Sequence, residues 1–99
     1  MSNQHDQDRD RIAEAMNKVQ TKSGWTEKEF ESLDQAVYAF ETLCEPRGWR
    51  WMRDGEGDWY GFQPKGLRES VCVSPTRNHA ADVCRLVCLV LDREASDAK

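Results

Sequence analysis

The sequence lacks most features that mark secreted, membrane-spanning or catalytic proteins. It has only two histidines in 99 residues, and no apolar run approaches the roughly 20 residues that a membrane helix needs. The chain opens with polar residues and not with a basic start and an apolar stretch, so we expect no secretion signal and a cytoplasmic location. With 38% hydrophobic and 32% charged residues, the composition is typical of one globular domain without membrane contact.

Paired Cys-x-x-Cys spacing, which prepares a tetrahedral zinc site, is also missing. In a reducing compartment we expect all four cysteines to be free thiols that pack as small apolar residues. The alternatives are two disulfides, or a zinc site that includes His79. We therefore predict no metal and no cofactor. The cysteines are Cys44, Cys72, Cys84 and Cys88.

No set of residues indicates a known reaction. His5 falls in an expected tail, and His79 falls in the first turn of an expected helix, where the helix dipole disfavours a charged imidazole. The apolar neighbours of Cys84 predict an inert buried thiol and not a nucleophile. The carboxylates of residues 54–58 miss the spacing of a calcium loop. We predict that the protein is not an enzyme.

Polar ends flank one expected domain. We predict a folded domain over residues 8–93 and disordered tails at residues 1–7 and 94–99. Apolar side chains recur at helical spacing over residues 8–22, which predicts a short N-terminal helix. The weak amphipathic pattern of this helix does not specify a packing partner.

The second expected helix has the clearest start in the chain. Thr26 and Glu29 have the spacing of a capping box, in which each residue satisfies an N–H group of the first turn. Apolar side chains then recur at helical spacing up to Glu45. Pro46 and Gly48 are typical of a helix stop, so we expect one continuous helix between these signals.

Three short segments have the composition of strands, at residues 49–53, 59–63 and 70–74. The glycine-containing segment 54–58 is typical of a hairpin turn. Short connections then predict a three-stranded antiparallel meander. Apolar side chains fall on both strand faces, which favours a helix-sheet-helix sandwich with the tryptophan rings in its core.

A last helix is predicted from a cap at Ser74 or Thr76 to about Arg93. Between residues 83 and 91 only one side chain is polar, so this helix is either buried under several elements or presents an apolar face to a partner. One hypothesis is therefore self-association, as a homodimer, through Leu86, Leu89 and Val90.

The predicted fold class is α+β, in the order α-α-β-β-β-α, with a three-stranded antiparallel sheet, two main helices and a short N-terminal helix. Over residues 27–91, the tryptophan-rich hairpin, the third strand and the apolar helix with the segment ADVCR (residues 81–85) resemble the phage ABA sandwich proteins. The resemblance implies a phage or prophage protein in the host cell cytosol, without known catalytic residues. It identifies no active-site residue in this chain.

A stripe of mostly acidic side chains follows one flank of the second expected helix. Such a stripe can meet the lysines and arginines of a nucleic-acid-binding partner where phosphates normally lie. The alternative is a solvated helix face. We predict a host protein or protein complex as partner, and inhibition of a nucleic-acid-handling defence complex, as by an anti-CRISPR protein. The stripe consists of Glu27, Glu31, Asp34, Tyr38, Glu41 and Glu45.

A rival hypothesis is that the hairpin binds single-stranded RNA or DNA, with rings stacking on bases and cations meeting phosphates. Residues 46–77 hold six Lys or Arg against four Asp or Glu, whereas residues 1–45 hold five against ten. The small positive excess in the middle favours nucleic acid less than a protein partner. The residues that this hypothesis requires are Trp49, Arg50, Arg53, Trp59 and Lys65.

Overall fold

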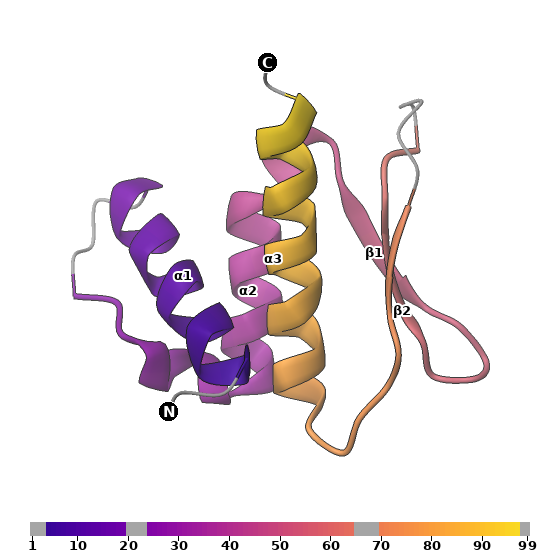
Figure 1. Cartoon of the computed structure of the whole chain (residues 1–99), viewed down its shortest axis with the longest axis horizontal. Helices are drawn as coiled ribbons and strands as arrows, with labels where there is room; N and C mark the ends of the chain where they lie inside the picture. Colours follow the sequence, from indigo (N-terminus) through magenta and orange to yellow (C-terminus); the bar gives the residue numbers. More distant parts are fainter. Residues whose placement is uncertain (1–3, 20–23, 65–69, 98–99) are drawn as a thin grey trace.

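A computed structural model describes residues 4–19, 24–64 and 70–97 of the chain. Three helices and a three-stranded sheet follow one another in the predicted order, which confirms the α+β fold (Figure 1). The elements are α1 (Gln4–Val19), the 3-10 helix η1 (Glu27–Glu31), α2 (Leu33–Leu43), the 3-10 helix η2 (Glu45–Arg47), β1 (Arg50–Arg53), β2 (Trp59–Phe62), β3 (Val71–Val73) and α3 (His79–Asp97).

The sheet is an antiparallel meander in the order β1-β2-β3, as predicted. Met52 lies opposite Tyr60, and Tyr60 lies opposite Cys72, so these three side chains form one row across the sheet. The turn between β1 and β2 is held by Asp54, whose Oδ1 accepts hydrogen bonds from two backbone N–H groups at 2.9 Å. Gly57 in this turn has a φ of +92°, a conformation that favours glycine.

All helices lie on one side of the sheet, so the predicted helix-sheet-helix sandwich is wrong (Figure 1). α3 packs on β2 and β3, while α1 and α2 pack on α3. The close approach of α3 depends on Gly61, because a Cβ atom there would lie 3.1 Å from Cγ2 of Val71 and 3.2 Å from Cγ2 of Val90. The sequence could not show on which side of the sheet the helices pack, because both strand faces carry apolar residues and the described helices cover only one of them.

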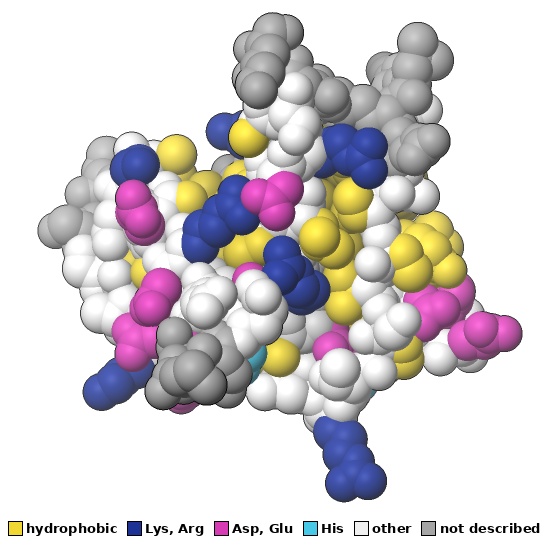
Figure 2. Space-filling view, viewed as in Figure 1, with side chains coloured by type: hydrophobic (Ala, Val, Ile, Leu, Met, Phe, Trp, Pro, Cys, Tyr) yellow, Lys and Arg dark blue, Asp and Glu magenta, His cyan; other side chains and the backbone are white. Residues whose placement is uncertain are grey.

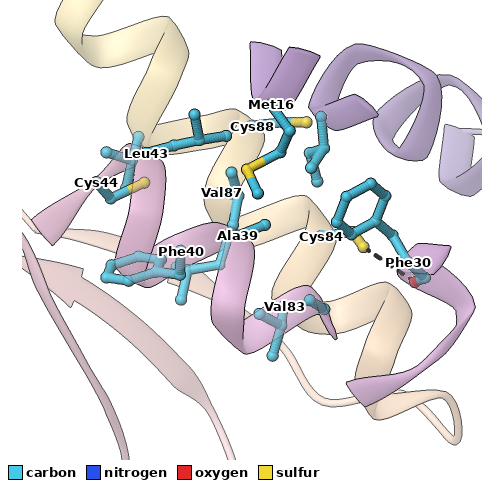
Figure 3. Packing of buried hydrophobic residues seen from close by; sticks show 14 of the residues in the cluster. Met16, Phe30, Ala39, Phe40, Leu43, Cys44, Val83, Cys84, Val87 and Cys88 are labelled. Carbon is cyan, nitrogen blue, oxygen red and sulfur yellow. Dashed lines mark hydrogen bonds between the residues drawn. The ribbon is translucent and has the colours of Figure 1, made fainter. Parts of the chain in front are cut away.

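α3 is apolar around most of its circumference because other elements surround it. Leu86 and Val90 are fully buried, so the apolar face expected to mediate a homodimer is already covered within one chain. Figure 3 shows Cys84 and Cys88 facing Phe30 and α1, whereas Val87 faces α2. Of the four tryptophans, those at 25, 49 and 59 are buried, which agrees with the expected core, and only Trp51 is exposed.

The second expected helix is divided at Ser32, whose φ of −88° and ψ of 134° are extended. η1 precedes this residue and α2 follows it, so residues 26–45 do not form one helix as predicted. The capping contact is confirmed, because the Thr26 N–H bonds to Oε2 of Glu29 at 2.6 Å. The break turns Phe30 into the core against Trp25, with ring centroids 5.5 Å apart. Tertiary packing of Phe30 thus overrides the continuous helical periodicity.

Both terminal helices extend into segments predicted as tails. α1 begins at Gln4, whose Nε2 donates to Oδ1 of Asp8 at 2.9 Å, and α3 continues to Asp97. Near the end of α3, Oε1 of Glu94 accepts from Nε1 of Trp49 at 2.6 Å. These side-chain contacts stabilise helical turns that the polar composition alone does not favour. The helix cap of α3 also differs from the prediction, and is Asn78, which accepts from the N–H of Ala81 at 3.1 Å.

α1 docks on the rest of the domain through apolar and charged contacts. Ile12 and Met16 are fully buried, and Arg9 is nearly so, with its Nη1 2.7 Å from Oε1 of Glu31. Figure 2 shows basic and acidic side chains close together over the helices. Arg11 of α1 is also paired with Asp92 of α3, with 2.6 Å between Nη1 and Oδ1. Over the described residues, no helix combines the length and apolar character of a membrane span.

Candidate binding surfaces

The histidines and cysteines form no chemical centre among the described residues, where no three metal-binding side chains converge. Burial raises the pKa of both Cys44 and Cys84 to about 12, and raises that of Cys88 further, so these thiols stay protonated. The Cys84 thiol donates to the Phe30 carbonyl at 3.5 Å. Cys72 is exposed on β3, which corrects its expected place in the core.

The two histidines lie on different helices and have different surroundings. His5 belongs to α1 and not to a tail, and burial lowers its pKa. His79 begins α3, as expected, with its ring centroid 6.1 Å from that of Trp59 and its Nδ1 3.8 Å from Oδ2 of Asp82. Neither arrangement supplies a base beside a nucleophile.

We call the six residues of the predicted stripe the acidic surface, and the structure distributes them over η1, α2 and η2. Glu31 is paired with Arg9, and Oε1 of Glu45 lies 3.4 Å from Nη1 of Arg50. The centre keeps its negative charge, since Asp34 and Glu41 are exposed and have no ion pair with another described residue. The ends of the acidic surface are thus partly neutralised, and its centre is not. Its members are Glu27, Glu31, Asp34, Tyr38, Glu41 and Glu45.

Tyr38 stands at this centre and is 42% exposed. Its ring lies 6.1 Å from that of Trp25, with 29° between the planes, so a buried indole supports it from one side. Trp25, Asp34, Gln35 and Tyr38 line an open depression of about 410 Å³. A tyrosine held in place by a buried ring is a residue type that protein interfaces favour for their central contacts, and charged side chains such as these carboxylates belong to the polar rim.

Trp25 also lines a second open depression, of about 560 Å³. Asp10 and Glu14 of α1 line it together with Glu27 of the acidic surface and with Lys18, whose Nζ lies 3.3 Å from Oε1 of Glu14. The sequence analysis missed these two α1 carboxylates. Their four-residue spacing places them on one helix face, but only the packing of α1 beside η1 brings that face next to the acidic surface.

The residues proposed to bind nucleic acid do not form one surface. Trp49 and Trp59 are buried, and Arg50 lies on the outer sheet face, whereas Arg53 lies on the face that α3 covers. The guanidinium carbon of Arg53 is 4.8 Å from the centroid of the Trp59 ring. Lys65 lies outside the described residues.

No helix in the described part of the chain covers the outer face of the sheet. This face carries Met52, which is 47% exposed, together with half-buried Tyr60 and Phe62 and exposed Arg50 and Cys72. These side chains share a face because directly opposed residues in an antiparallel sheet point the same way. This uncovered apolar face is the second candidate binding surface.

The hairpin end of this face has a defined charge state. The hydrogen bond from the Tyr60 hydroxyl to Oδ2 of Asp54, 3.0 Å long, raises the pKa of Tyr60 to about 12. Desolvation acts to raise the pKa of Asp54, but the hydrogen bonds from the N–H of Asp58 and from Tyr60 together lower it. At neutral pH the site therefore holds a carboxylate and a neutral phenol.

No family model matches the chain, and no curated protein or solved structure matches it significantly. The resemblance to phage ABA sandwich proteins stays a prediction from the sequence. The functional argument therefore depends on the geometry of the two surfaces.

Proposed function

We propose that the protein is a non-enzymatic binding protein that captures another protein on its acidic surface. The observation that supports this proposal is Tyr38, an exposed ring supported by Trp25 and flanked by Asp34 and Glu41. An aromatic anchor among carboxylates suits a partner surface that combines an apolar pocket with lysines or arginines.

The partner class that this charge favours is a host protein or complex that handles nucleic acid. Carboxylates on the acidic surface take the positions of phosphates on the basic track of such a partner. Asp10 of α1 enlarges the negative area beside Trp25, whereas the charge of Glu14 is balanced by Lys18. A phage or prophage protein that inhibits a nucleic-acid-handling defence complex, in the manner of an anti-CRISPR protein, would need this kind of surface.

The test is affinity capture from host lysate at increasing salt, with identification of the captured protein. Asp34→Lys and Glu41→Lys, combined, should abolish capture, and Tyr38→Ala should weaken it. Glu56→Lys is the control matched to Asp34→Lys or Glu41→Lys alone, because it makes the same charge change as either single reversal at an exposed position in the hairpin turn. Capture that is unchanged by the double reversal and insensitive to salt would exclude the acidic surface.

Binding of single-stranded RNA or DNA is the second candidate function. The uncovered outer sheet face favours it, because Tyr60 and Phe62 present rings there with Arg50 at the edge. The buried Trp49 and Trp59 cannot stack on bases in this fold. Filter binding with random single-stranded oligonucleotides at low salt tests this function, and no retention would remove it.

A further inference from the structure

β1 is an edge strand, and no other strand pairs with its outer side in the described part of the chain. All four of its residues are exposed, including Trp51 and Met52 at 38% and 47%. An exposed edge with apolar side chains is a template for pairing with another strand unless charges oppose it. Figure 2 shows hydrophobic side chains next to acidic ones over the hairpin end of the sheet.

The direction of the free backbone groups follows from the register of the hairpin. In an antiparallel pair, residues whose N–H and C=O face the neighbouring strand alternate with residues whose groups face away. The N–H of Asp54 bonds to the Asp58 carbonyl at 3.0 Å, so Asp54 faces β2. The alternation therefore turns the backbone groups of Arg53 and Trp51 outward, where a further strand can bond to them.

We infer that β1 pairs with β1 of a second copy of this chain, antiparallel, about a two-fold axis at Met52. The pairing joins two three-stranded sheets into one six-stranded sheet. Met52 then lies opposite Met52 of the second copy, and each Trp51 lies opposite an Arg53. Each Arg50 lies opposite an Asp54.

The side chains across this pairing are complementary on both faces. On the outer face, Arg50 meets Asp54, an opposite-charge pair that the two-fold axis repeats. On the inner face, Arg53 of one copy lies opposite Trp51 of the other. Trp51 and Arg53 already make contacts of the same kind with Trp59, at 5.6 Å between ring centroids and at 4.8 Å from guanidinium carbon to centroid.

Other registers lack this complementarity. A shift by two residues in one direction sets Arg50 opposite Glu56 but also Arg53 opposite Arg53. The same shift in the other direction sets Trp51 opposite Trp51 but leaves Arg50 opposite Met52. A shift by one residue sets outward-facing backbone groups against groups that are already bonded within the hairpin. Every antiparallel register of β1 with a second β1 is two-fold symmetric and closes into a dimer, so the side chains select only the register, which is the one centred on Met52.

Sedimentation equilibrium of the full chain tests the dimer, and we expect association that depends on concentration and weakens with salt. Arg50→Asp should raise the dissociation constant about tenfold, because two attractive pairs become repulsive, whereas Arg50→Lys should change it little. Trp51→Pro should abolish the dimer, because it removes an outward N–H group, and Trp51→Val should retain more of it. Circular dichroism checks that each variant folds.

Disulfide trapping provides an independent measurement of the register. In the inferred dimer the two Met52 positions form a non-hydrogen-bonded pair, with Cα atoms about 4.5 Å apart, which a disulfide can bridge. In a Cys72→Ser background, Met52→Cys should therefore give a covalent dimer when oxidised glutathione accepts the electrons of the two thiols. Arg50→Cys, on the same face and strand, should cross-link far more slowly.

A monomer at all concentrations, with equal cross-linking of the two cysteine variants, would overturn the inference. Dimerisation that Arg50→Asp and Trp51→Pro leave unchanged would also overturn it, since another surface must then pair. A chain that remains monomeric but binds a partner strand or an oligonucleotide along β1 would also overturn the inference, because β1 would then have a different occupant.

Discussion

The helices and the sheet of this protein are both rich in apolar residues, but only the helical region buries them from all sides. α3 is surrounded by α1, α2 and the sheet, so Val90, which faces the sheet, and Cys88, which faces α1, are both fully buried. The sheet is covered on one face only, and Met52 on the other face is 47% exposed. An apolar residue in this chain therefore indicates the core in one region and a binding surface in the other.

The sharpest test of this comparison is the removal of a large side chain from each region. Phe30→Ala should lower the free energy of unfolding by about 3–5 kcal/mol, because it empties a fully buried site beside Trp25. Met52→Ala should change it by no more than about 0.5 kcal/mol. Urea unfolding measures both, and similar losses for the two variants would contradict the comparison.

The contact between the two regions depends on Gly61. Gly61→Ala should destabilise the fold by about 1–3 kcal/mol, because the new Cβ atom would crowd Val71 and Val90 at 3.1 and 3.2 Å. Gly55→Ala is the matched control, since its φ is not positive and a Cβ atom there would meet nothing within 4 Å. Thermal unfolding followed by circular dichroism would rank the two variants, and equal melting temperatures would show that α3 does not approach β2 this closely.

A smaller loss of stability is expected at the contact between the end of α3 and Trp49, the residue that precedes β1. Glu94→Ala should cost about 1–2 kcal/mol, because it leaves the indole N–H of the fully buried Trp49 without its 2.6 Å acceptor. Glu94→Gln keeps an acceptor and should cost less. Urea unfolding followed by tryptophan emission reports both stability and the environment of Trp49, and equal losses for the two variants would contradict the role of this hydrogen bond.

The smallest effect concerns the pH dependence of the hairpin. The pKa of Asp54 lies below its ordinary value of 3.8 in the folded chain, so ionised Asp54 contributes stability above that value. This contribution should be lost as the pH falls through the lower, folded pKa. The difference in stability between the wild type and Asp54→Asn should therefore disappear in acid. A difference that stays constant with pH would show that the Asp54 charge is not involved.

Much of the fold followed from short-range patterns. The composition of residues 49–53 and 59–63 predicted apolar side chains on both strand faces, and the register confirms this, because Trp51 and Met52 lie on opposite faces. The capping contact between Thr26 and Glu29 was predicted from their spacing. These features depend on residues a few positions apart, and such local rules are the ones that a sequence displays directly.

The candidate surfaces were only partly predictable. The spacing of the acidic surface was visible in the sequence, but the neutralisation of Glu31 by Arg9 joins residues from two elements that are far apart in the chain. The contribution of Asp10 also requires α1 to dock beside η1. The break at Ser32 was missed because the apolar period continues through it, while the burial of Phe30 decides the backbone there.

The sequence by itself determined the order of helices and strands, the hairpin and the face to which each strand residue points. These follow from periodicity, capping and turn chemistry, which act between neighbouring residues. Only the tertiary structure decided which sheet face is covered, because α1, α2 and the sheet all pack against the same helix and none remains for the outer face. That choice leaves the edge and outer face of the sheet, and the acidic surface, as the parts of the molecule available to a partner.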